Sequence, residues 1–423
     1  MTLSKLGRAA LAFVAAVAMG LGMTSCGGGT IGFMWVLGTQ YNQVAGYKID
    51  DYTGNLTSTV GSPYTSGGTN PVMLVVKSGG RYVYVLNAGS PTITTVAGVS
   101  TISNNSSNIS IFSVGGDGTL NYQESFPSAG YSPIYLTTDT SGNFLYVLDQ
   151  VSPDAIAAGC LTTLPQSTAN CFGDITAYAL DPDTGRATLL QNQSFKNANG
   201  TQLTYFNVGL KPIMMKYATN GCLYTLDAGN QSLFPYSASG GTGQLVLTTN
   251  AAITTGASQL TSINGNASYL YLTDAGANQI LPYTYGTNCA LNTVTGGSVN
   301  NLLLTSNPVY SFIDAKGKFL YVLNQSGTNV NNANSTISAF VIESTGQLQA
   351  IAGSPYGVGA GPMCMVEDPT DQYVYTSNFF DGTVTGKLIN QNTGELALLS
   401  RGSTFNAFAK AGATCLVISG NID

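Results

Sequence analysis

Short apolar runs, each ended by a polar turn, recur along the whole chain. The stretch RYVYVLNAGS (81–90) shows the unit: an apolar run from Tyr82 to Leu86 stops at Asn87, and the chain turns at Gly89. Runs of this length that are rich in Tyr and Val and bounded by Asn and Gly are typical of β-strands. The hydrophobic pattern therefore predicts an all-β protein built from short strands.

Nearly the same phrase occurs seven times. The copies are FMWVLG (33–38), YVYVLN (82–87), FLYVLD (144–149), CLYTLD (222–227), YLYLTD (269–274), FLYVLN (319–324) and YVYTSN (373–378). The third position is Trp once and Tyr six times, and successive copies start 49, 62, 78, 47, 50 and 54 residues apart. Repeats of about 50 residues in a strand-rich chain indicate a β-propeller. We interpret each copy as the second strand of a blade, with its Tyr or Trp packed between blades.

Each repeat supplies four strands. In the unit around the sixth copy, NPVYSFID is an inner strand, FLYVLN the second, STISAFVIE the third and LQAIAGS the outer strand. Four antiparallel strands make one blade. The first copy lacks an inner strand, whereas GATCLVIS (412–419) looks like an inner strand without a blade. We predict a single seven-bladed β-propeller over residues 33–423, closed by the C-terminal strand completing the first blade.

The N-terminal segment predicts export. Residues 1–25 begin with the positive charges of Lys5 and Arg8 and continue into an apolar segment (9–22). That segment is short for a membrane span and typical of a signal peptide.

The residues that follow predict a lipid anchor. MTSC ends at Cys26 and resembles a bacterial lipobox, in which the cysteine receives lipid; an ordinary cleaved secretion signal is the alternative. Residues 26–32 form a Gly-rich tether. Because Gly27 rather than Asp follows the lipid site, we expect an outer-membrane lipoprotein, periplasmic or surface-exposed, whose membrane partner is reached through the lipid.

The charge composition excludes some functions. Charged residues make up 8% of the chain, against roughly 25% in average proteins. The 14 Lys and Arg and 20 Asp and Glu give −6, or −8 once residues 1–25 and their two cations are removed. Such a chain is a poor binder of nucleic acid. The absence of histidine excludes Ser–His–Asp and Cys–His catalysis.

Six cysteines remain when Cys26 is assigned to lipid. An even number in an exported protein favours disulfides, and no metal-binding Cys spacing occurs. The first two share one insertion, the last two hold equivalent places on inner strands of adjacent blades, and the middle two are left. The predicted pairs are Cys160–Cys171, Cys364–Cys415 and Cys222–Cys289.

The Tyr-Val-x-x-Asn strands, together with a proline before the inner strands, resemble the seven-bladed lactonase family. Those prolines are Pro71, Pro133, Pro212, Pro308 and Pro362. The family includes 6-phosphogluconolactonase-like and muconate-cycloisomerase-like propellers, and the resemblance covers residues 33–419. It implies lactone hydrolysis by clustered His, Arg and Glu. This chain has no His and, after residue 25, only three Arg, so no catalytic residue carries over and enzymatic activity stays an open question.

Unrepeated segments are the expected binding surface. Insertions 88–107, 150–173 and 325–334 each follow a second strand and should open on one face. Connections on that face carry aromatics that could stack on sugars or pack between loops: Tyr64, Tyr131, Tyr205, Phe206, Tyr356, Phe405 and Phe408.

Polar residues end six of the seven second strands. They are Asn87, Asp149, Asp227, Asp274, Asn324 and Asn378. As a ring they could hold Ca²⁺ or a polar ligand; alternatively, each caps its own turn. Lys211 and Lys410 lie in loops that enter inner strands and could meet an anionic ligand or remain solvated. No other cofactor and no metal motif are predicted.

Three functions fit these observations. The first is a lipid-anchored binding module of the cell envelope, with a glycan or protein partner. The second is a sugar-lactone hydrolase with a carboxylate or metal site, and the third is a structural subunit of a surface assembly. With −8 charge and no histidine, we do not expect useful hydrolysis of the anionic 6-phosphogluconolactone.

Overall fold

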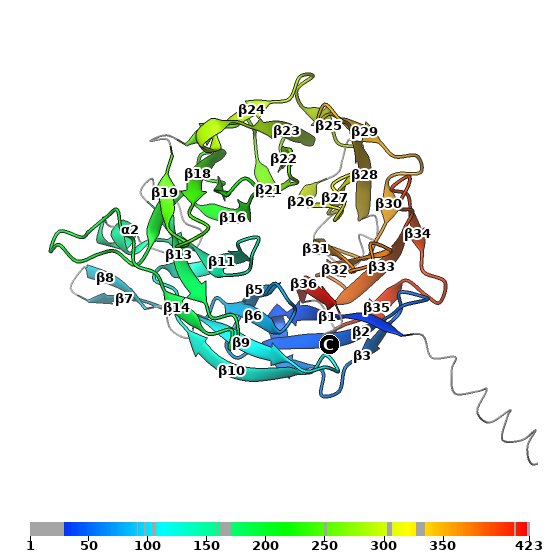
Figure 1. The fold of residues 1–423 in the computed structure, drawn as a ribbon, viewed down its shortest axis with the longest axis horizontal. Coiled ribbons are helices and arrows are strands. Elements are labelled where there is room, and N and C mark those ends of the chain that lie inside the picture. The colour runs from blue at the N-terminus through cyan, green and yellow to red at the C-terminus, as the bar shows by residue number, and fades with distance from the viewer. Residues whose placement is uncertain are drawn as a thin grey trace, which may run out of the picture.

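The computed structural model describes residues 29–90, 92–96, 99–103, 107–158, 160, 171–248, 252–302, 307–326, 335–409 and 412–420. Within these residues, seven β-sheets stand around a central axis (Figure 1). Each sheet runs from an inner strand at the axis to outer strands at the rim, and neighbouring strands are antiparallel. The predicted all-β, seven-bladed propeller is confirmed.

The strands of each blade follow one another from the axis outward. The first blade holds β36 (Ala413–Gly420), β1 (Thr30–Gly38), β2 (Gln43–Asp50) and β3 (Leu56–Ser58). The second holds β5 (Pro71–Val76), β6 (Tyr82–Asn87), β9 (Asn108–Val114) and β10 (Leu120–Phe126). The third holds β11 (Tyr131–Thr138), β12 (Phe144–Val151), β13 (Phe172–Leu180) and β14 (Ala187–Leu189). The fourth holds β16 (Pro212–Tyr217), β17 (Cys222–Asp227), β18 (Ser232–Ala238) and β19 (Leu245–Leu247).

The remaining blades have the same order. The fifth holds β21 (Leu260–Gly265), β22 (Tyr269–Asp274), β23 (Gln279–Tyr285) and β24 (Leu291–Thr293). The sixth holds β26 (Pro308–Ile313), β27 (Phe319–Asn324), β28 (Thr336–Ile342) and β29 (Leu348–Ala350). The seventh holds β31 (Pro362–Glu367), β32 (Tyr373–Asn378), β33 (Thr383–Ile389) and β34 (Leu396–Leu398).

The outer row differs from the prediction in six of the described blades. A second short strand also pairs with the third strand, so two pieces replace one outer strand. In the sixth blade the predicted strand LQAIAGS ends at Ala350, because the chain then turns, with the Ser354 amide bonded to the Ile351 carbonyl. The second pieces are β4 (Tyr64–Thr65), β15 (Phe206–Leu210), β20 (Ile253–Thr254), β25 (Val299–Asn300), β30 (Tyr356–Gly357) and β35 (Thr404–Asn406).

The two ends of the described chain close the ring in the first blade. β36 lies antiparallel to β1, with Trp35 opposite Val417, as predicted. β1 begins at Thr30, three residues before the predicted start of the propeller, so part of the expected tether is strand. The disulfide Cys364–Cys415 joins the inner strands of the seventh and first blades, with Cα atoms 5.1 Å apart. Closure is therefore both hydrogen-bonded and covalent.

The third-position aromatic of the repeat joins each blade to the next. Its ring nitrogen or hydroxyl donates a hydrogen bond to a glycine carbonyl in the turn between the third and outer strands of the following blade, a contact we call the interblade latch. The latches are Trp35 to Gly118 (3.1 Å), Tyr84 to Gly185 (2.6 Å), Tyr146 to Gly243 (3.3 Å), Tyr271 to Gly346 (3.0 Å), Tyr321 to Gly394 (3.0 Å) and Tyr375 to Gly54 (2.6 Å).

The glycine of each latch is required by two constraints at once. Gly118 has φ +83°, a left-handed conformation that glycine adopts without a Cβ penalty. A Cβ there would also collide with the ring of Phe33, the first residue of the repeat. Gly185 has the same relation to Tyr82. The first and third repeat positions thus hold one turn of the next blade, which explains why the phrase recurs.

The interface between the fourth and fifth blades departs from this rule. The first repeat position is Cys222, which forms a disulfide with Cys289, with Cα atoms 5.7 Å apart. Cys289 ends the short helix η2 (Thr287–Cys289), which stands where other blades have the latch turn. The hydroxyl of Tyr224 forms no such bond with a glycine carbonyl of the fifth blade, and its polar neighbour is Asn220 of its own blade. Here a covalent bond replaces the latch.

Two of the insertions carry structure of their own. Strands β7 (Thr92–Val96) and β8 (Val99–Ser103) form a hairpin after β6. After β12, helix α2 (Pro153–Ala157) is capped by Ser152, and Cys160 is bonded to Cys171. All three predicted disulfides are therefore confirmed. No helix among the described residues is long and apolar enough to span a bilayer.

Candidate ligand site at the channel mouth

A cavity of about 760 Å³ opens at one end of the central channel. Inner strands β11, β16, β21, β26 and β31 line it, together with the turns that lead from inner to second strands in the fifth and sixth blades. These turns lie on the face opposite the insertions on which the sequence placed the binding surface. The cavity therefore adds a candidate site that the sequence did not single out.

One position of the inner strand sets the chemistry of this channel end. Counting starts at the inner-strand residue that is proline in five of the blades, and the position meant is the fifth residue. In each of the seven blades, the residue at this position lines either this cavity or the cavity that adjoins it. The seven residues are Val75, Thr137, Lys216, Asn264, Phe312, Val366 and Val417. Lys216 is the charged member of this otherwise neutral set.

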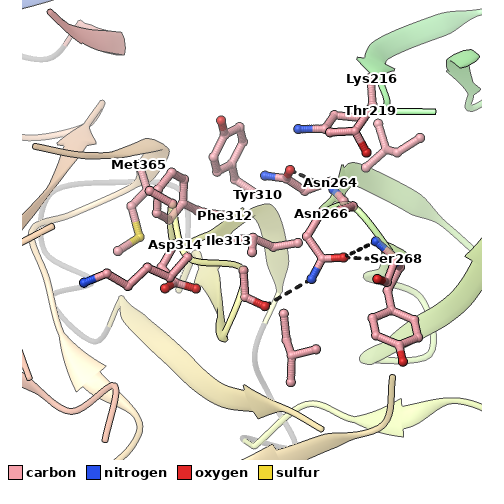
Figure 2. Close-up of a pocket in the computed structure, with 18 of the residues that line it drawn as sticks. Lys216, Thr219, Asn264, Asn266, Ser268, Tyr310, Phe312, Ile313, Asp314 and Met365 are labelled. Atoms are coloured by element: carbon pink, nitrogen blue, oxygen red, sulfur yellow. Dashed lines mark hydrogen bonds between the residues drawn. The ribbon is translucent and has the colours of Figure 1, made fainter. Parts of the chain in front are cut away.

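Lys216 lies on β16 and points into the cavity, toward Tyr310 and Asn264 (Figure 2). Its side chain is partly exposed to the cavity. Among the described residues its ammonium has no hydrogen bond and no ion pair, since the ion pairs join other groups. Burial lowers the pKa of Lys216 to about 8. The cavity thus contains one cation without a counterion.

Acidic groups gather on the other side of the channel mouth. Burial raises the pKa of Glu367 to about 7, and its carboxylate accepts a hydrogen bond from the Ala315 amide at 2.6 Å. Burial also raises the pKa of Asp314, whose oxygen accepts from the amides of Lys318 and Phe319. Glu367 lines a second cavity of about 510 Å³ that shares a wall with the first. The mouth is therefore polarised, with Lys216 opposite a set of carboxyls.

Amide side chains stiffen the rim between these groups. Asn266 donates to the Gly317 carbonyl at 3.1 Å and accepts from the Ser268 and Tyr269 amides, as Figure 2 shows. Asn264 donates to the Ser311 carbonyl at 2.9 Å. These bonds tie the turn of the fifth blade to the sixth. The rim is thus preorganised.

The six polar residues that end the second strands do not form an exposed ring. All are buried, with exposed fractions of 0–2%, and they bond within or beside their own blades. Asp274 accepts amide hydrogen bonds from Ser258 and Gln259 and from Gly276 in its own turn. Asn378 donates to the hydroxyls of Thr383 and Thr385 on β33, 2.9 Å away in each case. Asp274 thus caps its own turn, as one interpretation held, whereas Asn378 bonds to the third strand of its blade. Binding of Ca²⁺ or a ligand by these residues stays a prediction.

The same position in the third blade is exceptional. Asp149 faces Asp174 directly across β12 and β13, and Asp174 faces Asn207 on β15. Asp149 accepts from the hydroxyls of Ser128 and Thr176, whereas neither oxygen of Asp174 has a partner. Burial raises the pKa of Asp149 to about 7 and, with Asp149 close by, raises that of Asp174 well above its ordinary range. The pair therefore retains a proton at neutral pH, held chiefly by Asp174.

The remaining candidates lie away from the cavity. Lys211 is exposed beside β16 and does not line it, and Lys410 lies outside the described residues. Tyr64 is half-buried and donates to the Val60 carbonyl, and Tyr356 donates to the Ala352 carbonyl. Asp227 is buried, and burial raises its pKa to about 7. Both tyrosines bond to a carbonyl of their own loop, and Tyr356 lines a separate cavity of about 520 Å³. Their role in ligand binding stays a prediction.

The sequence carried a signal for the cavity that its repeats obscured. The inner strand PIMMKY has Lys216 where PVMLVV, PVYSFI and PMCMVE have Val or Phe. Aligning the inner strands rather than the second strands would have exposed this substitution. Among the described residues no group of three or more Cys, Asp or Glu is arranged to hold a metal ion.

Comparison with known proteins identifies the family. The chain belongs to the lactonase family of seven-bladed β-propellers, whose family model matches residues 32–158 and 290–406. The predicted resemblance is thereby confirmed. No curated protein matches the sequence.

Solved structures share the fold at low sequence identity. A candidate 6-phosphogluconolactonase of Bacteroides fragilis is 16% identical, with a TM-score of 0.64, over 92% of this chain and 98% of that chain. A candidate 6-phosphogluconolactonase of Bacteroides uniformis is 14% identical, with a TM-score of 0.67, over 92% and 100%. The periplasmic gluconolactonase of Pseudomonas aeruginosa is 14% identical, with a TM-score of 0.66, over 93% and 100%. These likenesses show the fold alone.

Proposed function

We propose that this protein is an exported, lipid-anchored propeller that binds a small polyhydroxylated molecule, a sugar lactone or sugar acid, in the channel-mouth cavity. The observation that carries the proposal is the cavity itself, about 760 Å³ and open to solvent. Ligand sites typically measure about 300–1,000 Å³ and combine apolar walls with a few polar groups. Family membership supports the ligand class, since a structural neighbour is a gluconolactonase.

The walls suit a sugar-like ligand. Tyr310 and Phe312 offer aromatic surface on which the C–H face of a sugar can pack. Thr137 and Asn264 bring a hydroxyl and an amide to the same space. The preorganised rim keeps the cost of ordering on binding low.

Blocking the cavity should abolish binding. Thr219 is exposed on the cavity rim, and in Thr219→Trp the indole would fill the entrance. We expect a loss of affinity of at least tenfold, about 1.4 kcal/mol, measured by calorimetric titration with aldonic acids, their lactones and alditols. The matched control is Gly241→Trp, on an exposed turn of the same blade where a Cβ meets nothing within 4 Å. Equal loss in both variants, or no binding by the wild type, would contradict the proposal.

Hydrolysis is the second candidate, favoured by two groups that titrate near neutrality at one channel end. The carboxylate of Glu367, with pKa about 7, could take a proton from a water that attacks the lactone carbonyl. The ammonium of Lys216 could stabilise the oxyanion of the tetrahedral intermediate. When the ring C–O bond breaks, the protonated Glu367 would return its proton to the departing ring oxygen. The same panel, followed as acid release, decides: turnover on the order of 1 s⁻¹ that is lost in Glu367→Gln supports hydrolysis, and its absence leaves binding.

The lipid anchor is tested by fractionation. Cys26→Ser removes the thiol that the lipobox pattern assigns to lipid, so the protein should move from the membrane to the soluble fraction. Anchoring depends on the lipid at this cysteine, because one acyl chain alone binds membranes only marginally and stable anchoring takes two signals. Met23→Leu, which restores the usual lipobox residue, should remain in the membrane fraction. An unchanged distribution of the Ser variant would show that this cysteine anchors nothing.

A further inference from the structure

We propose that Lys216 binds a carboxylate group of the ligand, so that the channel-mouth cavity prefers a sugar acid to its neutral derivatives. This inference rests on the proposed function and names the chemical class within it. The group responsible is the Lys216 ammonium, which has no ion-pair partner. The residues that line the channel at the same inner-strand position in the other blades are neutral.

The position of Lys216 is built into the fold. It is the fifth residue of β16 and pairs across the sheet with Tyr224 on β17. Both strands belong to the blade whose next interface is fastened by Cys222–Cys289. The backbone that presents the ammonium is thereby held by a covalent bond, and the side chain projects into the cavity (Figure 2).

The charged groups that share the cavity leave Lys216 without a counterion. One carboxylate oxygen of Asp314 accepts hydrogen bonds from the backbone amides of Lys318 and Phe319, at 2.7 and 2.6 Å. Lys316 is paired with Asp371 at 3.2 Å. Glu343 lies on the rim, and neither it nor Asp314 forms an ion pair with Lys216. Burial raises the pKa of Tyr135 and Tyr310, so these two phenols of the cavity carry no charge at neutral pH.

A charge that is partly withdrawn from water and has no partner is unfavourable, so the site favours a ligand that brings the missing anion. One ammonium suits a carboxylate of single charge. A phosphate dianion would need more cations, and the carboxyls of Asp314 and Glu343 at the same mouth would repel it. The rest of the ligand then lies against Tyr310 and Phe312 with its hydroxyls near Asn264 and Thr137.

Binding should depend on pH in one direction. Burial lowers the pKa of Lys216 to about 8, so about nine-tenths of the molecules carry the charge at pH 7. A bound carboxylate raises the pKa of the ammonium, which makes binding take up a proton near pH 8. Affinity for an acid is therefore complete below about pH 7 and falls toward tenfold per pH unit above pH 8.

The experiment compares gluconate with gluconamide, which has the same hydroxyls and no charge. We expect the wild type at pH 7 to bind gluconate at least tenfold more tightly. In Lys216→Met this preference should vanish while affinity for gluconamide is kept. In Lys216→Arg the preference should persist, and its decline between pH 7 and 9 should disappear because guanidinium does not titrate there. Lys387→Met, which replaces a buried lysine outside the cavity, is the control for folding.

Each outcome has one meaning. Equal affinity of the wild type for gluconate and gluconamide, or an unchanged preference in Lys216→Met, overturns the role of Lys216 and leaves the proposed function in place. Failure to bind any member of the panel overturns the proposed function, and this inference with it. A preference whose pH dependence survives in Lys216→Arg assigns the titration to another group and also overturns the inference.

Discussion

A chain that ends at Phe408 is expected to lose its cooperative thermal unfolding. The truncation removes β36, which pairs with β1 and buries Ala413, Cys415 and Leu416. It also removes the Cys364–Cys415 disulfide, a type of bond worth about 2–4 kcal/mol. Whole domains are stable by only about 5–15 kcal/mol. The first blade would be left with β1 as an open edge and the seventh blade would lose the strand that packs against it, so the protein should aggregate.

Two companion variants separate the causes of that loss. A chain that ends at Gly420 keeps β36 and should melt like the full chain. Leu416→Ala, at a side chain 1% exposed, should lower the free energy of unfolding by about 2–4 kcal/mol without opening the ring. Calorimetry is the measurement, and an unchanged melting curve of the Phe408-terminated chain would rule out closure by β36.

Asp174→Asn is expected to stabilise the protein at pH 8 and to have little effect at pH 4. The folded-state pKa values of Asp149 and Asp174 are raised above the ordinary 3.8. Their contribution to stability is therefore fully present below pH 4 and is lost as the pH rises through about 7. An amide at this position would donate to Asp149, as Asn87 donates to Asn108 at 2.8 Å in the second blade. We expect a gain of about 2–4 kcal/mol at pH 8.

Replacing Asp274, which holds the same repeat position in the fifth blade as Asp149 does in the third, should have the opposite sign. Burial acts to raise the pKa of Asp274, but hydrogen bonds from Ser258, Gln259 and Gln279 outweigh it and lower the pKa. Asp274→Asn turns an amide group toward those donors, so we expect a loss of about 1–3 kcal/mol at pH 5–8. Chemical denaturation at several pH values measures both variants. Equal effects in the two blades would show that Asp149 and Asp174 share no proton.

The fold was readable because it is repeated. Seven copies of one phrase define seven second strands, and the lone C-terminal strand has only one blade to complete. The Cys364–Cys415 disulfide followed from the same alignment, since equivalent positions in neighbouring blades lie side by side. Cys160–Cys171 followed from a shared insertion, and Cys222–Cys289 joins the two cysteines that remained. What the alignment could not give is the division of the outer row into two strands. Local turns such as that after Ala350 decide this, and they differ among the blades.

The site was less predictable for a physical reason. Repeated polar residues such as Asn378 are conspicuous in the sequence as candidate ligands. A polar group that recurs in almost every blade has a structural role within the blade, and the burial of these residues agrees with that role. Lys216 is a single charged residue in an otherwise largely apolar strand. Its role depends on whether the neighbouring inner strands form a cavity around it. That geometry arises only when five inner strands meet at the axis.

Because a disulfide replaces one interblade latch, completion of the ring depends on whether the compartment around the chain is reducing or oxidising. When the cysteines are reduced, the interface between blades four and five has neither its disulfide nor a latch hydrogen bond from Tyr224. The interface between blades seven and one loses the Cys364–Cys415 disulfide. The molecule then consists of two arcs, blades one to four and blades five to seven. At one joint both the disulfide and the latch are missing, whereas the other joint keeps the Tyr375–Gly54 latch and the pairing of β36 with β1. We expect such a chain to remain pliable in a reducing compartment and to become rigid only after an oxidant has acted. For the exported chain proposed above, this delay allows passage through a membrane pore in the unfolded state, because these two disulfides form only afterwards.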